Sequence, residues 1–155
     1  MIVVSDTTAV TTLLKAGMEG LLRELFGSVI IPQAVWDELN AFHSQLPDFV
    51  LLRALARPGS RLPGTASLGL GEAEAITLAK EVNADLLLTD DLKARGVAAR
   101  LNVKSIGLLG LLIRAKQRGY VPSVRDAIGT LQRQGGLYLS EAVKAEALRL
   151  AGELP

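Results

Sequence analysis

The order of apolar and polar positions along the chain predicts short buried strands that alternate with helices. Runs of three or four apolar, often β-branched residues that end at polar residues are typical of strands buried on both faces. Such runs occur at residues 2–5, 28–31, 85–89 and 103–106. Residues 50–56 are also apolar, but this run fits either a strand or a helix. The pattern therefore predicts four strands, or five if residues 50–56 also form a strand.

Helical spacing of apolar residues predicts helices between these strands and after the last of them. Thr7 or Thr8 is expected to cap the first helix. A segment rich in Gly, Pro and Ser, residues 58–71, is expected to be a loop. The helices are expected at about residues 7–17, 19–26, 32–42, 72–82, 92–101, 108–118, 123–134 and 140–150.

This alternation indicates the fold class. Buried strands that alternate with helices are typical of an α/β protein, in which a central parallel sheet is covered by helices on both faces. The sequence contains no internal repeat, low-complexity segment or evident linker. We therefore expect one domain over residues 1–155, with a central sheet of four or five strands.

The composition limits how this chain could bind a metal. Its 155 residues include no cysteine and one histidine, His43. Disulfides, thiolate catalysis, cysteine-bound zinc and multi-histidine metal sites are therefore excluded. Any bound metal must be held by oxygen atoms.

The sequence also indicates where the protein is found. Residues 1–6 contain no basic residue and only a short apolar run, unlike a secretory signal peptide. No apolar stretch reaches the ~18 residues that a membrane-spanning helix needs. We therefore expect a cytoplasmic protein without a membrane association.

The formal net charge of +1 conceals a strongly uneven distribution. Residues 1–91 carry a net charge of −6, residues 92–125 a net charge of +8, and the remainder −1. An acidic first part followed by a basic segment suits a metal site that acts on a polyanionic substrate. The alternative is that these charges only solvate exposed helix faces.

Acidic residues fall where strands end. Asp6 follows the first expected strand, and Asp90 and Asp91 follow the run at 85–89. In an open parallel sheet, ligands bind beyond the carboxyl ends of the strands, so these residues should share one edge. Glu38 and Glu72 lie on helices that could reach the same edge.

Each of these acids has a purely structural alternative. In this alternative, Asp6, Asp90 and Asp91 are no more than helix caps, and Glu72 is an acid favoured by a helix dipole. Glu38 is then an ordinary exposed helix residue. Together, however, four acids from separated segments would repel one another, and a bound cation is the usual reason for such a cluster. Carboxylates without histidine or cysteine favour Mg²⁺ or Mn²⁺, which suits metal-assisted hydrolysis of a phosphodiester.

Four segments, in this order, resemble the acidic motifs of PIN domains. The resemblance runs through about residues 2–120 and implies a three-layer PIN-like fold. It also implies a ribonuclease site that depends on magnesium or manganese. The segments are Ser5-Asp6-Thr7-Thr8, Val35-Trp36-Asp37-Glu38-Leu39, Gly71-Glu72-Ala73-Glu74-Ala75-Ile76-Thr77-Leu78-Ala79 and Leu87-Leu88-Thr89-Asp90-Asp91.

Carried over by position, the resemblance assigns roles to individual residues. The acidic quartet, serving both as metal ligands and as catalytic residues, becomes Asp6, Glu38, Glu72 and Asp90. Thr7 or Thr8 would supply a hydroxyl that orients water or phosphate. At the third position this chain has glutamate, one methylene longer than the aspartate usual in the toxins of the family.

Two further acids compete for places in the quartet. Glu74 competes with Glu72, although helical spacing turns it about 200° away around the axis. Asp91 either joins as an auxiliary ligand or only caps the next helix. Asp90 is preferred because it is nearer the end of its strand.

The resemblance also implies partners. Many prokaryotic PIN proteins are the toxin of a type II toxin–antitoxin pair, usually dimeric and blocked by a small antitoxin. RNA, a small antitoxin protein and a second copy of the chain are therefore the expected partners. The C-terminal helices, about residues 123–152, would form a dimer or partner surface.

Basic residues follow the Asp90-Asp91 pair. Lys93 and Arg95 come first and are expected to hold phosphates that flank the cut, unless they only border buried apolar stripes. Aromatic residues make up only 4% of the chain and are scattered, so a base-stacking platform is not expected. Recognition of folded RNA by shape, or at one loop, fits better. The other basic residues of this segment include Arg100, Lys104, Arg114, Lys116 and Arg118.

Two other functions compete with a ribonuclease. The first is a catalytically weak PIN-like module that binds RNA or protein. The second is a phosphatase or phospho-acceptor. A phosphatase of this kind needs an acid two residues after Asp6, where Thr8 stands, and a phospho-acceptor needs an acidic pair after the first strand rather than at 90–91.

Overall fold

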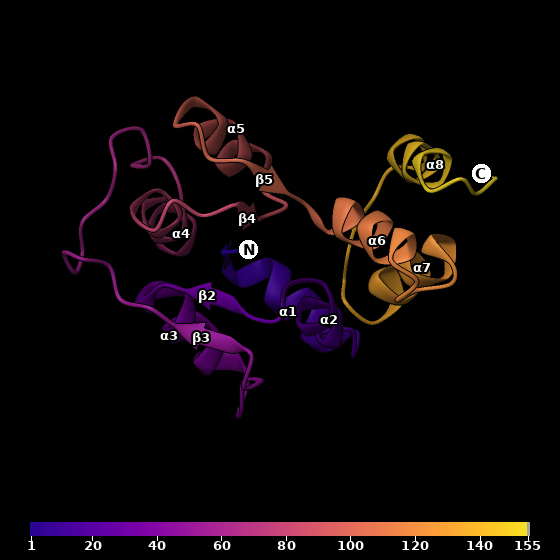
Figure 1. The fold of residues 1–155 in the computed structure, drawn as a ribbon, viewed down its shortest axis with the longest axis horizontal. Helices are drawn as coiled ribbons and strands as arrows, with labels where there is room; N and C mark the ends of the chain where they lie inside the picture. The colour runs from indigo at the N-terminus through magenta and orange to yellow at the C-terminus, as the bar shows by residue number, and fades with distance from the viewer. Residues whose placement is uncertain (155) are drawn as a thin grey trace.

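A central sheet of five parallel strands forms the middle layer of the protein, and helices cover both of its faces (Figure 1). The computed structural model describes residues 1–154. The spatial order of the strands is β3-β2-β1-β4-β5. They are β1 (Val3–Ser5), β2 (Val29–Ile31), β3 (Val50–Leu52), β4 (Leu86–Leu88) and β5 (Ser105–Ile106). The predicted α/β class with a parallel sheet of four or five strands is confirmed.

The ambiguous apolar run at 50–56 contains a strand at the edge of the sheet. Val50 pairs in parallel with Val29 of β2. Leu51 and Leu52 are 45% and 42% exposed, because an edge strand has no neighbour beyond it to cover them. The helices, which agree closely with the expected ones, are α1 (Thr7–Lys15), α2 (Gly20–Phe26), α3 (Gln33–Phe42), α4 (Leu70–Glu81), α5 (Leu92–Arg100), α6 (Leu108–Gln117), α7 (Val124–Arg133) and α8 (Glu141–Leu150).

The two faces of the sheet bury separate apolar clusters. Successive residues of a strand point to opposite faces. Val3 accordingly packs with residues of α1, α2, α3, α6, α7 and α8, whereas Val4 packs with residues of α4 and α5. None of the helices described over residues 1–154 is both long enough and apolar enough to cross a membrane.

Two expected helix starts are wrong. Asp6, rather than Thr7 or Thr8, caps α1: its Oδ1 accepts a hydrogen bond from the amide of Ala9 at 3.0 Å. Aspartate caps at least as well as threonine, and here it directly follows the strand. Helix α4 begins at Leu70 instead of residue 72, with Gly69 as its cap.

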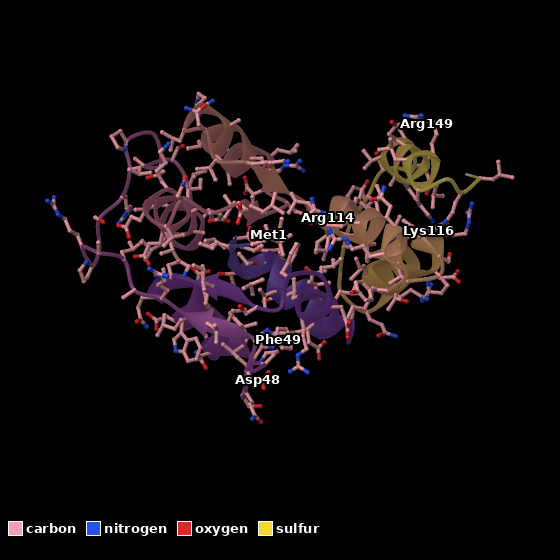
Figure 2. All side chains as sticks on the ribbon, viewed as in Figure 1. Met1, Asp48, Phe49, Arg114, Lys116 and Arg149 are labelled. Atoms are coloured by element: carbon pink, nitrogen blue, oxygen red, sulfur yellow. The ribbon has the colours of Figure 1, made fainter. Side chains whose placement is uncertain are left out.

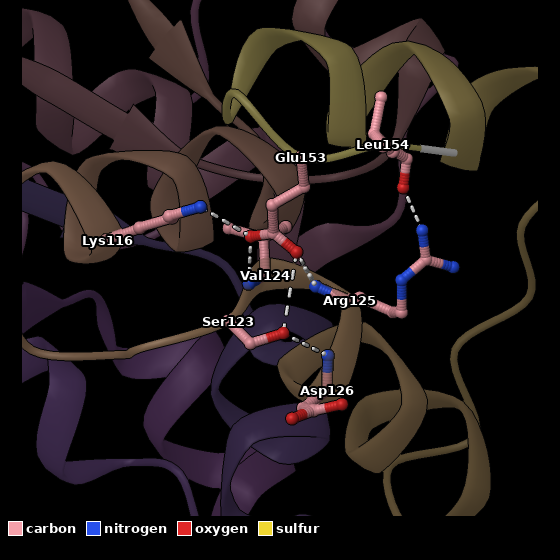
Figure 3. A network of polar contacts seen from close by, with 7 residues as sticks. All are labelled: Lys116, Ser123, Val124, Arg125, Asp126, Glu153 and Leu154. Atoms are coloured by element: carbon pink, nitrogen blue, oxygen red, sulfur yellow. Dashed lines mark hydrogen bonds and ion pairs between the residues drawn. The ribbon is translucent and has the colours of Figure 1, made fainter.

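The segment after α8 is joined to α6 and α7 by polar contacts centred on the carboxylate of Glu153 (Figure 3), in addition to the apolar packing of Ala147 and Leu148. This carboxylate accepts hydrogen bonds from Lys116 Nζ at 2.9 Å, from the Val124 amide at 2.6 Å and from the Arg125 amide at 3.1 Å. Ser123 Oγ also donates to it, at 3.4 Å. The carboxylate therefore caps the N-terminus of α7, where the helix dipole favours negative charge.

These contacts set the protonation behaviour of Glu153. Burial opposes ionisation, but the hydrogen bonds from Lys116 and from the two amides outweigh it and lower the pKa of Glu153 to about 2. Because the pKa is lowered on folding, the ionised carboxylate stabilises the fold above its unfolded pKa near 4.5. That stabilisation is lost as the pH falls from about 4.5 towards 2.

We predict that Glu153→Gln lowers the free energy of unfolding by about 1–3 kcal/mol at pH 7, because charge-assisted hydrogen bonds to a half-buried carboxylate are lost. Urea unfolding monitored by circular dichroism measures this loss. The difference between wild type and variant should shrink below pH 4.5. Glu146→Gln, which breaks only the exposed pair with Arg149, is the matched control and should change stability little. Equal stability of all three proteins at pH 7 would contradict the role of Glu153.

Candidate active site at the carboxyl edge of the sheet

Two central strands bring Asp6 and Asp90 to the same edge of the sheet. β1 and β4 are parallel neighbours, with Ser5 opposite Leu88. The amide of Asp6 continues this pairing by donating to the carbonyl of Leu88 at 3.0 Å. Asp6 follows β1 directly, and Asp90 follows β4 after one residue. The expected meeting of these segments, 84 positions apart in sequence, is therefore a consequence of parallel register.

Asp6 is a buried carboxylate held by two donors. Its side chain is only 2% exposed. Oδ1 accepts from the Ala9 amide, and Oδ2 accepts from the hydroxyl of Thr89 at 2.6 Å. Burial raises the pKa of Asp6 to about 6 against the lowering effect of these two hydrogen bonds, and the charges of Glu72 and Asp90 raise it further. The Asp6 carboxylate is thus fixed in place and interacts electrostatically with two other acids of the expected quartet.

Asp90 is positioned by the helix that follows β5. Its Oδ1 accepts from the amide of Leu108, the first residue of α6, at 2.8 Å. Burial raises the pKa of Asp90, while this hydrogen bond and the positive charge of Arg95 partly offset the rise. Asp91 differs from Asp90, because it is exposed and caps α5 by accepting from the Ala94 amide at 2.9 Å.

Glu38 lies beside the start of α1. The hydroxyl of Thr7 donates to its Oε2 at 2.5 Å, so the side chain of Glu38 reaches from α3 to the residue after Asp6. Thr8, in contrast, is exposed, and no polar contact joins its side chain to an acid among residues 1–154.

Glu72 and Glu74, the two candidates for the third acid of the quartet, have different surroundings in the structure. Glu74 is buried and accepts from the Ala34 amide at 3.0 Å, so it caps the N-terminus of α3 from the neighbouring helix. Glu72, in the first turn of α4, is half-buried and acts on the charge of Asp6. The carboxylate of Glu74 therefore joins α4 to the start of α3, whereas Glu72 faces the site.

Three of the four carboxylates lie against a glycine, where a larger residue would displace them. A β-carbon at Gly71 would lie 2.9 Å from both carboxylate oxygens of Glu38, and one at Gly107 would lie 2.5 Å from Oδ1 of Asp90. The pairs are Gly69 with Glu72, Gly71 with Glu38, and Gly107 with Asp90. The absence of side chains at these glycines leaves room for the acids at the edge.

The donor chemistry of this edge fits a hard divalent cation. All four acids offer only oxygen, and the glycines leave them space. Within residues 1–154, however, no three acidic or histidine side chains converge closely enough to form a ready metal-binding group. The acids therefore lie near the same edge but do not form a closed cluster in this part of the chain.

The basic segment divides into near and distant parts. The half-buried Arg95 acts on Asp90 and lies beside Gly107, whereas Lys93 is exposed on α5. Arg114 and Lys116, which Figure 2 labels, lie in the last turn of α6. A helix rises about 1.5 Å per residue, which places Lys116 about 12 Å along α6 from Leu108. Lys116 binds Glu153 instead of lining the acidic edge.

Thr89 belongs to the site but was not among the residues predicted from the sequence. This buried hydroxyl donates to Asp6 and accepts from the amide of Asp91 at 3.3 Å, so it connects the two acidic segments. The available signal was a hydroxyl residue at the end of a buried strand, immediately before the acidic pair.

Comparisons with known proteins identify the family. A family model described as a PIN domain matches residues 2–153. The chain belongs to the PIN-domain family. A PilT N-terminus domain protein from the hyperthermophilic archaeon Sulfolobus solfataricus P2 has a similar fold, with a TM-score of 0.54 and 22% sequence identity over 74% of this chain and 93% of that chain. No curated protein matches the chain.

Membership confirms the resemblance seen in the sequence and gives the site a general chemistry. PIN domains are generally nucleases, which hydrolyse phosphodiester bonds, and they generally use divalent metal ions. The matched segment continues past residue 120 and includes α7 and α8, so the PIN-domain match is longer than the four motifs indicate.

We predict that Asp6→Asn stabilises the metal-free protein by about 1–3 kcal/mol at pH 7. The pKa of Asp6 is raised on folding, so the ionised form is destabilising, and the stability of the wild type falls as the pH rises from about 4 to about 6. Asparagine keeps the shape and removes the charge. Urea unfolding with EDTA at pH 4 to 8 measures the difference between the two proteins.

This difference should grow between pH 4 and pH 6 and then remain constant. Asp37→Asn, on an exposed residue of α3, is the control and should follow the wild type. A metal-free Asp6→Asn protein that is less stable than wild type at pH 7 would refute the proposed charge repulsion.

Proposed function

We propose that this protein is a metal-dependent endoribonuclease that hydrolyses phosphodiester bonds of RNA at the carboxyl edge of its sheet. The observation that supports this most directly is the parallel pairing of β1 with β4, which brings the buried Asp6 to the same sheet edge as Asp90. Burial, and to a smaller extent the charges of Glu72 and Asp90, raises the pKa of Asp6. Like charges that share one edge of a sheet, one of them buried, are destabilising unless they serve a cation. The chain belongs to a family whose members are generally nucleases, so the cation would serve phosphodiester hydrolysis.

Asp6, Glu38, Glu72 and Asp90 are the residues that would hold Mg²⁺ or Mn²⁺. When bound, such an ion offsets the charge that develops on a phosphate and activates water for attack. The protein's own contribution is positioning: Ala9 and Thr89 fix the carboxylate of Asp6, and the start of α6 fixes that of Asp90. Fixed ligands need little reorganisation when substrate arrives.

Arg95 and Thr7 are the proposed substrate-side groups. Arg95 is a half-buried cation beside Asp90, well placed to bind a phosphate next to the one that is cut. Thr7 donates to Glu38 and so orients that carboxylate. Thr8 and Lys93 are exposed and would contribute weakly, through the backbone of bound RNA.

A second part of the proposal concerns the biological role of this nuclease. Many prokaryotic PIN proteins are toxins of type II pairs, so we propose a toxin role with a small antitoxin and a second copy of this chain as partners. A short neighbouring reading frame that encodes a DNA-binding pattern would support this role. A catalytically weak binding module is the alternative, and an RNA cleavage assay separates the two.

We predict that the wild type cleaves single-stranded RNA with Mn²⁺ or Mg²⁺, that EDTA abolishes cleavage and that added Mn²⁺ restores it. Asp6→Asn and Asp90→Asn should each lower the cleavage rate by about 10²-fold or more, because each removes a ligand charge. Gel analysis of a labelled RNA gives the rates.

Asp37→Asn is the matched control, since this exposed acid is adjacent to Glu38 on α3 and bonds only to Gln33 at 2.8 Å. It should cleave at the wild-type rate. Cleavage that survives EDTA, or an Asp6→Asn variant as active as the control, would overturn the metal-dependent mechanism. No cleavage by the wild type, together with tight binding of RNA, would favour the binding module.

A further inference from the structure

A pocket of about 420 Å³ opens beside Asp90, and the acidic quartet does not account for it. This size is within the usual range for small-ligand sites, ~300–1,000 Å³. Asp90, Arg95 and Ser105 are its polar lining residues, and most of the other lining residues are apolar. The apolar members are Leu92, Ile106, Leu109, Leu137, Tyr138, Leu139 and Val143.

The connection between α7 and α8 supplies the outer wall of the pocket. Figure 1 shows this connection running past the start of α6, which is where Asp90 is bound. Tyr138, in the middle of the connection, is 89% exposed although it lines the pocket. Leu92, at the start of α5, also lines the pocket and is 82% exposed. Two large apolar side chains thus stand almost uncovered at the mouth of a pocket next to the candidate active site.

We propose that this pocket binds an unpaired nucleobase of the RNA, adjacent to the phosphate that is cut, with the base stacked on Tyr138. The proposal rests on the proposed nuclease function and adds a base-binding subsite, lined by Tyr138, to it. It also amends the expectation that scattered aromatic residues provide no stacking surface: Tyr138 is 48 positions from Asp90 in sequence but shares its pocket.

The charge of the pocket favours a nucleotide over an apolar peptide. A nucleotide needs an apolar face for its base and a cation for its phosphate, and Arg95 supplies the cation on the wall nearest Asp90. The segment 92–125, which supplies Arg95 and much of the wall, carries eight basic residues and no acidic one. A purely apolar peptide would remove both Arg95 and Asp90 from water and offer neither of them a new polar partner.

The test measures binding and not cleavage, so it is independent of the metal. Fluorescence anisotropy in EDTA gives the dissociation constants for a labelled single-stranded RNA octamer and for the same octamer with abasic sites at its central positions. The proteins are wild type, Tyr138→Ala, Tyr138→Phe and Tyr120→Ala. Tyr120, which is 42% exposed beyond the end of α6, does not line this pocket and serves as the matched control.

Tyr138→Ala should weaken binding of the intact octamer by roughly 5- to 150-fold, the range for losing one stacked base. Tyr138→Phe keeps the ring and should bind like the wild type, as should Tyr120→Ala. The abasic octamer should bind weakly, and equally, to wild type and Tyr138→Ala. This equality is the readout that a merely structural role of Tyr138 would not produce.

Equal binding of the intact octamer by Tyr138→Ala and Tyr120→Ala would overturn the base pocket, even if the wild type cleaves RNA. Equal loss for the intact and abasic octamers would also overturn it, because the effect would then not involve the base. Wild type that binds neither octamer would overturn it in favour of a protein occupant. Base-dependent binding without any cleavage would uphold the pocket and reject the nuclease.

Discussion

Parallel pairing of β1 with β4 brings Asp6 and Asp90 to the same edge of the sheet and so concentrates negative charge there. The hydrogen bonds and glycines around the site accommodate this charge. Asp6 cannot leave the edge, because its own amide continues the ladder to Leu88. Its carboxylate is buried, so the repulsion from Glu72 and Asp90 acts through a medium that screens it poorly. The fold therefore places unfavourable negative charge along one edge of the sheet, as expected for a site that attracts a cation.

Local hydrogen bonds keep this charge in place. The starts of α1 and α6 each give an amide to one of the two aspartates, and helix N-termini favour negative charge. Thr89 adds a third donor and connects the acidic segments of β1 and β4. Hydrogen bonds offset part of the burial cost of Asp6 but leave its pKa above the ordinary value, so the site is strained electrostatically and not geometrically.

Much of the fold and the place of the site could be predicted from the sequence. Short β-branched runs and helical spacing located almost every element, because parallel strands buried on both faces read as continuous apolar segments. The rule that ligands bind beyond the carboxyl ends of strands then placed Asp6 and Asp90 together. Glu72 could be separated from Glu74 by helix geometry, and the structure shows that Glu74 caps α3.

The parts that escaped prediction depend on contacts between distant residues. The run at 50–56 fitted either a strand or a helix, because the pairing with β2 that makes it a strand is not visible in its own residues. Lys116 was indistinguishable from a phosphate-binding residue until Glu153, 37 positions later, was placed against it. The presence of Tyr138 in the same pocket as Asp90 depends in the same way on where the connection between α7 and α8 runs.

Calorimetric titration of Mn²⁺ into the metal-free protein is the decisive measurement for the clustered carboxylates, because it requires neither RNA nor catalysis. We expect saturable binding by the wild type and by Asp37→Asn, and binding at least about 10-fold weaker in Asp6→Asn, which lacks one ligand charge. Equal affinity of Asp6→Asn and wild type for Mn²⁺, or no binding by either, would show that these carboxylates do not hold a cation.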